Sequence, residues 1–230
     1  WLLYVHTYEG QDALALVDAE GKHWPARLVS GEDFYMQPCW HPDGRRIAWV
    51  AWNHPNMPWD GTWLRTGKLA LTEGGLPTLY EMTTVVGDEH TAIFQPQFSP
   101  DGRLLAYVSD KSGWWQIYVY DLEAGEHRQL TQLTAEHGEP AWTQGVRTYT
   151  FSADGKRIFF LRNQMGTISL WHLEVATGAE QPLPLPGYSA LYQPAISPDG
   201  KRLALIASAG NIPPRVITCD LGGEVHTWRR

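Results

Sequence analysis

Residues 95–109 read QPQFSPDGRLLAYVS, and this stretch predicts a short strand, a tight turn and a second strand. The turn is Ser-Pro-Asp-Gly at residues 99–102. In it, proline presets its own φ, aspartate can bond the backbone and glycine tolerates a positive φ, all of which suit a type I turn. The second strand, Leu104 to Ser109, is almost wholly apolar, so we expect both of its faces to be covered.

The same text recurs three times in the chain. Residues 37–50 read QPCWHPDGRRIAWV, residues 193–206 read QPAISPDGKRLALI, and residues 149–160 give a looser copy, YTFSADGKRIFF. The Asp-Gly pairs begin at residues 43, 101, 154 and 199, which gives intervals of 58, 53 and 45 residues. A period of about 40 to 50 residues built only from strands is typical of a propeller blade with four antiparallel strands.

Each complete repeat contains four candidate strands. In the unit around residue 101 they are Gln95–Phe98, Leu104–Ser109, Gln116–Asp121 and His127–Thr131. In the last unit they are Gln193–Ile196, Arg202–Ala207, Arg215–Asp220 and Glu224–Trp228. The first residues fit the last three strands of a blade, at Leu2–Thr7, Ala13–Asp18 and His23–Val29. We therefore predict an all-β chain, a β-propeller of four-stranded antiparallel blades with four full blades and a partial N-terminal blade.

The predicted blades form one domain over residues 1–230, with approximate bounds 1–30, 34–82, 93–131, 139–185 and 190–230. An arc of five blades exposes two blade faces that a ring of seven or eight blades would bury. A compact five-bladed ring, an open arc and self-association through the exposed faces are all compatible with the sequence, and we favour an open or associated arc. A strand from Val225 to Arg230 is one candidate to complete the first blade, because closure by both termini removes exposed edges.

Composition excludes several classes of protein. The formal net charge of −7 argues against a nucleic-acid surface, which needs clustered Lys and Arg. The chain has no run of about 18 apolar residues, so we expect no membrane span. Cys39 and Cys219 are too few for a disulfide scaffold, and we expect both in the core. No charged and then apolar leader is present, although Trp1 falls inside a predicted strand and the natural start can lie upstream; we expect a cytoplasmic protein.

Two regions lengthen the repeat, residues 53–61 and the connection that follows Trp142, residues 143–146. Residues 53–61 read NHPNMPWDG and form an ordered loop between the second and third strands of one blade. His54, Trp59 and Asp60 are not required by the strand pattern, and loops on rigid scaffolds often carry function. The alternative is structural, with Trp59 and Met57 folding back onto the blade and the two polar side chains bonding the loop's own backbone.

The turn at residues 111–115 contains the adjacent residues Trp114 and Trp115. Neighbouring side chains of an extended chain point to opposite faces, so at most one of the two can pack in a given layer between blades. We treat both as candidate binding residues, with structural packing as the alternative. The chain has 12 tryptophans, more than a core of this size needs, which points to packing wedges or to a recognition surface.

The sequence contains no recognisable catalytic group. No Gly-x-Ser-x-Gly motif occurs, since residues 187–191 read GYSAL, and we find neither a phosphate-binding glycine loop nor a His-Glu-x-x-His zinc pattern. Residues 88–90 (DEH) and 136–137 (EH) offer possible metal ligands, but solvated polar residues are expected in such connections. We predict no catalytic residue, no metal and no cofactor.

Several motifs resemble a known family. The Ser-Pro-Asp-Gly units resemble the TolB-type propeller repeat. Residues 52–62 (WNHPNMPWDGT) look like a loop in the propeller of the prolyl oligopeptidase family, in its acylaminoacyl-peptidase and dipeptidyl-peptidase branch. Residues 109–118 (SDKSGWWQIY) and 136–142 (EHGEPAW) are similar to the next two blades of that branch. The specific motifs cover residues 34–165, and residues 63–66 (WLRT) depart from the family's more usual Glu-Leu-Trp.

The resemblance implies a modular serine peptidase, in which a propeller of seven or eight blades restricts entry of short aminoacyl or acyl peptides to an α/β-hydrolase domain. That domain is absent from this chain. On this reading the five loop residues His54, Trp59, Asp60, Trp114 and Trp115 supply aromatic walls and a polar anchor for a peptide amine. The alternatives are a stand-alone TolB-like propeller that acts as an interaction scaffold, and a small hydrolase with a carboxylate site in its central channel.

Overall fold

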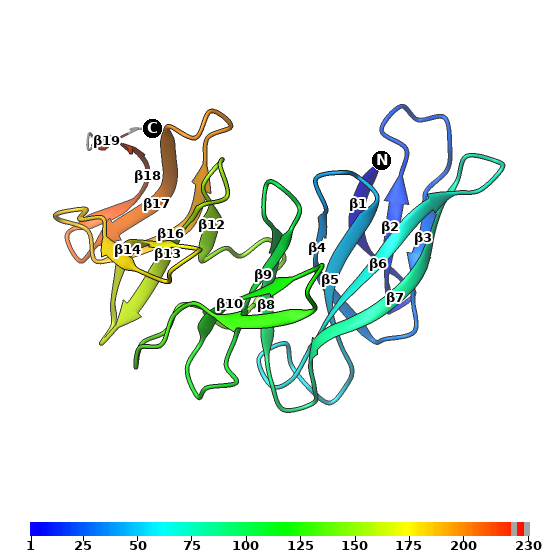
Figure 1. The fold of residues 1–230 in the computed structure, drawn as a ribbon, viewed down its shortest axis with the longest axis horizontal. Coiled ribbons are helices and arrows are strands. Elements are labelled where there is room, and N and C mark those ends of the chain that lie inside the picture. The colour runs from blue at the N-terminus through cyan, green and yellow to red at the C-terminus, as the bar shows by residue number, and fades with distance from the viewer. Residues whose placement is uncertain (222–224, 228–230) are drawn as a thin grey trace.

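The computed structural model describes residues 1–221 and 225–227, and every regular element in them is a β-strand (Figure 1). The strands form five antiparallel sheets that follow one another along the chain, one of three strands and four of four strands. The predicted all-β propeller architecture is confirmed. No helix in the described residues is long and apolar enough to cross a membrane.

The sheets contain consecutive strands in chain order. The first sheet is β1 (Leu2–Tyr8), β2 (Gln11–Val17) and β3 (Ala26–Val29). The second is β4 (Phe34–Trp40), β5 (Arg46–Trp52), β6 (Trp63–Leu71) and β7 (Pro77–Gly87). The third is β8 (Ile93–Phe98), β9 (Leu104–Ser109), β10 (Gln116–Asp121) and β11 (Glu126–Gln129). The fourth is β12 (Tyr149–Phe151), β13 (Arg157–Gln164), β14 (Thr167–Glu174) and β15 (Glu180–Pro182), and the fifth is β16 (Ala190–Ile196), β17 (Arg202–Ala209), β18 (Ile212–Asp220) and β19 (Val225–Thr227).

The Ser-Pro-Asp-Gly segment is the tight turn that the sequence predicts. The Gly102 amide donates to the Ser99 carbonyl at 2.8 Å, and Gly102 has a φ of 75°. The Ser99 hydroxyl donates to the Asp101 carboxylate at 2.6 Å, and this bond is the main cause of a lowered Asp101 pKa. The same amide bond closes the turns at Gly44, Gly155 and Gly200. One type of turn therefore joins the first and second strands in four blades.

Strand β9 is buried on both faces, as its apolar sequence predicts. Leu105 and Tyr107 pack in a cluster with residues of the second sheet, whereas Leu104 and Val108 pack in a cluster with residues of the fourth sheet. The alternation follows from the period of two along a strand. Each fully buried leucine or valine contributes about 1.5–3 kcal/mol relative to an exposed one, so the middle blade is held from both sides.

The five sheets form an open arc. Figure 1 shows the first sheet and the last sheet at opposite ends of the arc. The candidate closing strand lies elsewhere: Val225–Thr227 pairs with β18 in its own sheet, and the first sheet has three strands. Closure of the first blade by these residues is therefore wrong, because a hairpin partner next in the chain satisfies their backbone groups with a short connection. Residues 228–230 lie outside the described residues, and self-association stays a prediction.

The first strands of neighbouring blades meet at the inner edge of the arc. Gln37, Gln95 and Gln193 each precede a proline in such a strand, and each has a positive φ, between 50° and 58°. The backbone N–H of Gln95 donates to the side-chain oxygen of Gln37 at 2.7 Å. The side-chain nitrogen of Gln95 donates to the Tyr149 carbonyl at 2.7 Å. These bonds join β4, β8 and β12, which can meet together only near the axis of the arc.

Candidate binding face

Alternating connections place the long loops on one side of the arc. In the four complete sheets the connections from first to second strand and from third to fourth strand lie on one side, which we call the turn face; the strands of the first sheet correspond to the last three of a blade, so its β2–β3 connection lies on this side. The second-to-third connections of those four sheets, the β1–β2 connection of the first sheet and the connections from blade to blade lie on the other side, the loop face, at the bottom of Figure 1. The described loop-face connections are residues 9–10, 30–33, 53–62, 88–92, 110–115, 130–148, 165–166, 183–189 and 210–211. All five predicted binding residues lie on this face.

The loop of residues 53–62 is held by its own polar groups. The Asp60 carboxylate accepts a hydrogen bond from the Met57 amide at 2.8 Å, and the Asp60 amide donates to the Met57 carbonyl at 3.0 Å. The Asn56 side chain donates to the Glu89 carbonyl at 2.8 Å, which ties the loop to the next connection. Asp60 therefore bonds the loop's own backbone, as the structural alternative for this residue expects. Met57 does not fold back, because 46% of its surface is exposed.

His54 faces a different part of the surface from Trp59. The His54 amide donates to the Asp33 carboxylate at 2.9 Å, and the peptide bond between His54 and Pro55 is cis. The side chain lines a cavity of about 390 Å³ together with His6 and Arg27 of the first sheet. Trp59 is not among the residues that line this cavity. The structure therefore separates His54 from the aromatic part of the candidate site.

Trp59 packs against a tryptophan that is distant in the sequence. The ring centroids of Trp59 and Trp142 are 4.3 Å apart, with an angle of 47° between the planes. Trp59 is half-buried, whereas 73% of the Trp142 surface is exposed. An exposed aromatic pair offers a large apolar contact area with two indole N–H groups, which suits recognition of a ligand. Sequence reasoning quoted Trp142 in a motif but did not select it as a site residue.

The adjacent tryptophans have different surroundings. Trp115 packs against the largest described core cluster and makes an edge contact with Phe94, at 6.2 Å between centroids. Trp114 has 40% of its surface exposed on the loop face. The split agrees with the expectation that at most one of the pair packs between blades. Of these two tryptophans, only Trp114 has the exposure that a binding residue needs.

The connection from β11 to β12, residues 130–148, crosses the loop face, and we call it the strap. Near one end, the Glu136 carboxylate accepts a bond from the Trp115 amide at 2.8 Å, and Glu136 exchanges backbone bonds with Asn163. Near its other end, the Gln144 side chain donates to the Tyr35 carbonyl at 2.9 Å and accepts from the Gln37 amide at 3.0 Å. The strap thus links three blades and places Trp142 near the inner edge.

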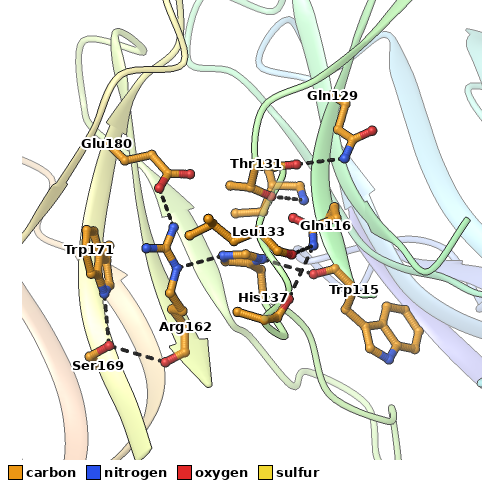
Figure 2. A network of polar contacts seen from close by, with 12 residues as sticks. Trp115, Gln116, Gln129, Thr131, Leu133, His137, Arg162, Ser169, Trp171 and Glu180 are labelled. Carbon is orange, nitrogen blue, oxygen red and sulfur yellow. Dashed lines mark hydrogen bonds and ion pairs between the residues drawn. The ribbon is translucent and has the colours of Figure 1, made fainter. Parts of the chain in front are cut away.

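His137 lies in a buried polar network within the strap (Figure 2). Its Nε2 accepts a hydrogen bond from Arg162 Nε at 3.0 Å, so Nδ1 carries the proton and donates to the Trp115 carbonyl at 3.1 Å. Burial, together with the Arg162 charge, lowers the pKa of His137 from 6.5 to about 4. Arg162 is 3% exposed, forms an ion pair with Glu180 and stacks over Trp171. Glu136 and His137 are thus occupied by structural bonds.

The loop face has a strong excess of negative charge. Its described connections contain nine carboxylates (Glu9, Glu32, Asp33, Asp60, Asp88, Glu89, Asp110, Glu136 and Glu139) and two cations (Lys111 and Arg147), a formal net charge of −7. Burial raises the pKa of Asp110, and repulsion from Asp88 and Glu136 adds to that rise. On the turn face the pKa of Asp101, Asp154 and Asp199 is lowered by bonds from the neighbouring serine hydroxyls. The loop face therefore favours the binding of cationic groups.

The polar connections of the loop face include possible metal ligands. The described residues contain no cluster of three or more His, Cys, Asp or Glu side chains that could hold a metal ion. In the connection at residues 88–92, the Asp88 carboxylate accepts bonds from the His90 amide at 2.8 Å and from the Thr91 hydroxyl at 3.2 Å. This carboxylate therefore organises its own turn. What the face offers is stacking on indole rings and attraction of positive charge.

Comparison with known proteins identifies relatives of the chain. The family model PD40, the TolB beta propeller domain, matches residues 2–227. The uncharacterized peptidase YuxL of Bacillus subtilis is 32% identical over 127 residues, which cover 51% of this chain and 18% of that protein. Dipeptidyl-peptidase 5 of Porphyromonas gingivalis is 27% identical over 173 residues, 71% of this chain and 22% of that protein.

A solved structure matches almost the whole chain. The puromycin-hydrolyzing peptidase of Mycobacterium tuberculosis has a TM-score of 0.84 and 29% sequence identity, and the match covers 96% of this chain and 34% of that one. These comparisons confirm the resemblance to TolB-type propellers and to peptidases of the prolyl oligopeptidase family. The chain spans about a third or less of each of these relatives.

Proposed function

The chain belongs to the TolB beta propeller domain family, PD40, and from this membership we propose that it is the non-catalytic, substrate-gating part of a serine peptidase. The parent enzyme would belong to the prolyl oligopeptidase family and hydrolyse short aminoacyl or acyl peptides. Its α/β-hydrolase domain would lie outside these 230 residues. The arc would then form part of a ring of seven or eight blades.

The strongest support is the structural match over 96% of this chain to about a third of a peptidase. A domain of that relative size and without a recognised nucleophile is suited to control access to chemistry that occurs elsewhere in the polypeptide. The loop face supplies features that such a role needs. It combines the exposed Trp59–Trp142 pair with a net charge of −7, a combination suited to a short peptide with a free amine.

The isolated chain is expected to show no hydrolysis of aminoacyl or acyl-peptide chromogenic substrates, because it would lack the nucleophile. The assay compares the purified 230-residue chain with the full parent enzyme at equal concentration. Turnover that follows the pure chain through successive purification steps would contradict the proposal. The parent gene gives a second readout: a downstream Gly-x-Ser-x-Gly motif supports the peptidase, whereas its absence favours the interaction scaffold.

Replacing Trp59 or Trp142 with alanine in the full parent enzyme is expected to raise KM by about three- to tenfold, because one aromatic contact contributes about 0.5–1.5 kcal/mol. The melting temperature of Trp142→Ala should change little, since Trp142 is 73% exposed. Trp24→Ala is the matched control, because Trp24 is 90% exposed and lies on the turn face. If the tryptophan variants lose melting temperature while KM stays unchanged, the Trp59–Trp142 pair has only a packing role.

A further inference from the structure

The network around His137 holds the strap closed. We propose that His137 and Arg162 form a proton-operated latch, and that protonation of His137 releases the strap and separates Trp142 from Trp59. The closed state requires a neutral imidazole, because Nε2 must accept the bond from Arg162 Nε at 3.0 Å. A protonated ring has two N–H donors and no acceptor, so it cannot keep this bond.

Among the described residues, no carboxylate bonds to the His137 ring. Arg162 from β13 is the charged group that faces it most closely, and the carboxylate that neutralises Arg162, Glu180 from β15, sits on the guanidinium (Figure 2). Glu136, the neighbour of His137 in the strap, uses its carboxylate on the Trp115 amide. On the remaining sides His137 meets the Phe160 ring, at 5.3 Å between centroids, and the Trp115 carbonyl. A positive ring would therefore face Arg162 in a buried site, which is costly.

Arg162 is the fixed half of the latch. Its guanidinium stacks over Trp171 at 4.1 Å and over Phe160 at 5.4 Å, and it pairs with Glu180. These contacts all lie within the fourth sheet and do not involve the strap. When His137 takes up a proton, Arg162 stays in place and the strap is the part that moves.

The direction of the pH dependence follows from the pKa of His137. In the closed state this pKa is about 4, below its ordinary value of 6.5, so closing is fully favoured above pH 6.5 and is progressively lost as the pH falls toward about 4. At the other end of the strap, the bond from the Gln37 amide to the Gln144 side chain is exposed, and the bond from Gln144 to the Tyr35 carbonyl is partly buried. Neither bond is fully buried, so both compete with water, and this end of the strap is the weaker attachment.

The Trp59–Trp142 pair gives a spectroscopic measure of the closed strap. Two indole rings at 4.3 Å and 47° couple their transitions and give an exciton couplet in circular dichroism. The couplet of the 230-residue chain is followed from pH 7.5 downward, and Trp142→Phe, which removes it, identifies the signal. Global unfolding is followed separately by the β-sheet signal of Trp142→Phe. No peptide is needed, so the outcome is independent of the proposed peptidase role.

Wild-type protein is expected to lose the couplet between pH 6.5 and about 4, before the sheets unfold. His137→Gln, whose amide can accept from Arg162 and donate to Trp115 but cannot titrate, should keep it over the same range. Arg162→Met should weaken the couplet already at neutral pH, whereas Arg157→Met, at the opposite end of β13, should not. The latch is wrong if wild type keeps the couplet until it unfolds, or if His137→Gln loses it at the same pH. If Arg162→Met does not fold, the His137→Gln comparison decides.

Discussion

Replacing Gly61 with alanine is expected to lower the free energy of unfolding by about 3 kcal/mol, among the largest effects of any single methyl group added to this chain. A Cβ atom at Gly61 would lie 2.2 Å from the backbone carbon and oxygen of Glu89 and 2.7 Å from the His90 nitrogen. These are backbone atoms, so no side chain can rotate away to relieve the overlap. The loop that carries Trp59 would have to separate from the connection at residues 88–92.

Urea denaturation of the Gly61→Ala variant measures this effect, and the Trp59–Trp142 couplet reports whether the loop has moved. Gly210→Ala is the control, because a Cβ atom there meets no atom within 4 Å. Its unfolding free energy should stay within about 0.5 kcal/mol of wild type. Equal stability of both variants would mean that the loop and the neighbouring connection are not packed as described.

Gln95→Leu is expected to cost about 2–4 kcal/mol of stability. The Gln95 side chain accepts from the Thr148 amide at 2.6 Å and donates to the Tyr149 carbonyl at 2.7 Å, and Gln95 is 5% exposed. Leucine has a similar size but leaves the Tyr149 carbonyl of β12 and the Thr148 amide of the strap without these bonds. Each buried group left unsatisfied costs about 1–3 kcal/mol.

The matched control is Gln193→Leu. Gln193 also has a positive φ and precedes a proline, so the cost of placing leucine in a left-handed backbone is shared by the two variants. Its side chain accepts one exposed bond, from Arg147 Nε at 3.3 Å. We expect a loss of less than about 1 kcal/mol, measured by urea unfolding in parallel. A similar loss in both variants would show that the penalty comes from the backbone rather than from the blade-to-blade bonds.

Much of the fold follows from local sequence. The Ser-Pro-Asp-Gly turns and their apolar second strands are determined by neighbouring residues, so the predicted bounds Leu104–Ser109 and Gln116–Asp121 agree with β9 and β10. Strands without a strong turn at one end were less well bounded, and β16 begins at Ala190 rather than at Gln193. The role of Gln95 could not be predicted, because its bonds reach residues of other repeats and its left-handed φ is unusual for glutamine.

The sequence predicts the position of some candidate residues but not their contacts. Trp59 was selected because the strand pattern does not need it, and Trp114 because it is one of two adjacent tryptophans; the structure places both on the loop face, and their binding role stays a prediction. The partner of Trp59 was missed, since the contact with Trp142 depends on how the strap crosses from the third blade. His137 resembled a possible metal ligand in the sequence, whereas its buried bonds to Arg162 and Trp115 depend on blade packing that no local pattern encodes.

The uneven charge of the two faces makes the domain electrically polar. A protein surface that binds the acidic loop face must either contribute positive charge or cause some of the loop-face carboxylates to become protonated. At physiological ionic strength the screening length is about 8 Å, so this requirement acts mainly during the last step of approach. The affinity of a partner surface for the loop face should therefore depend on salt concentration and on pH, even where the two surfaces are complementary in shape.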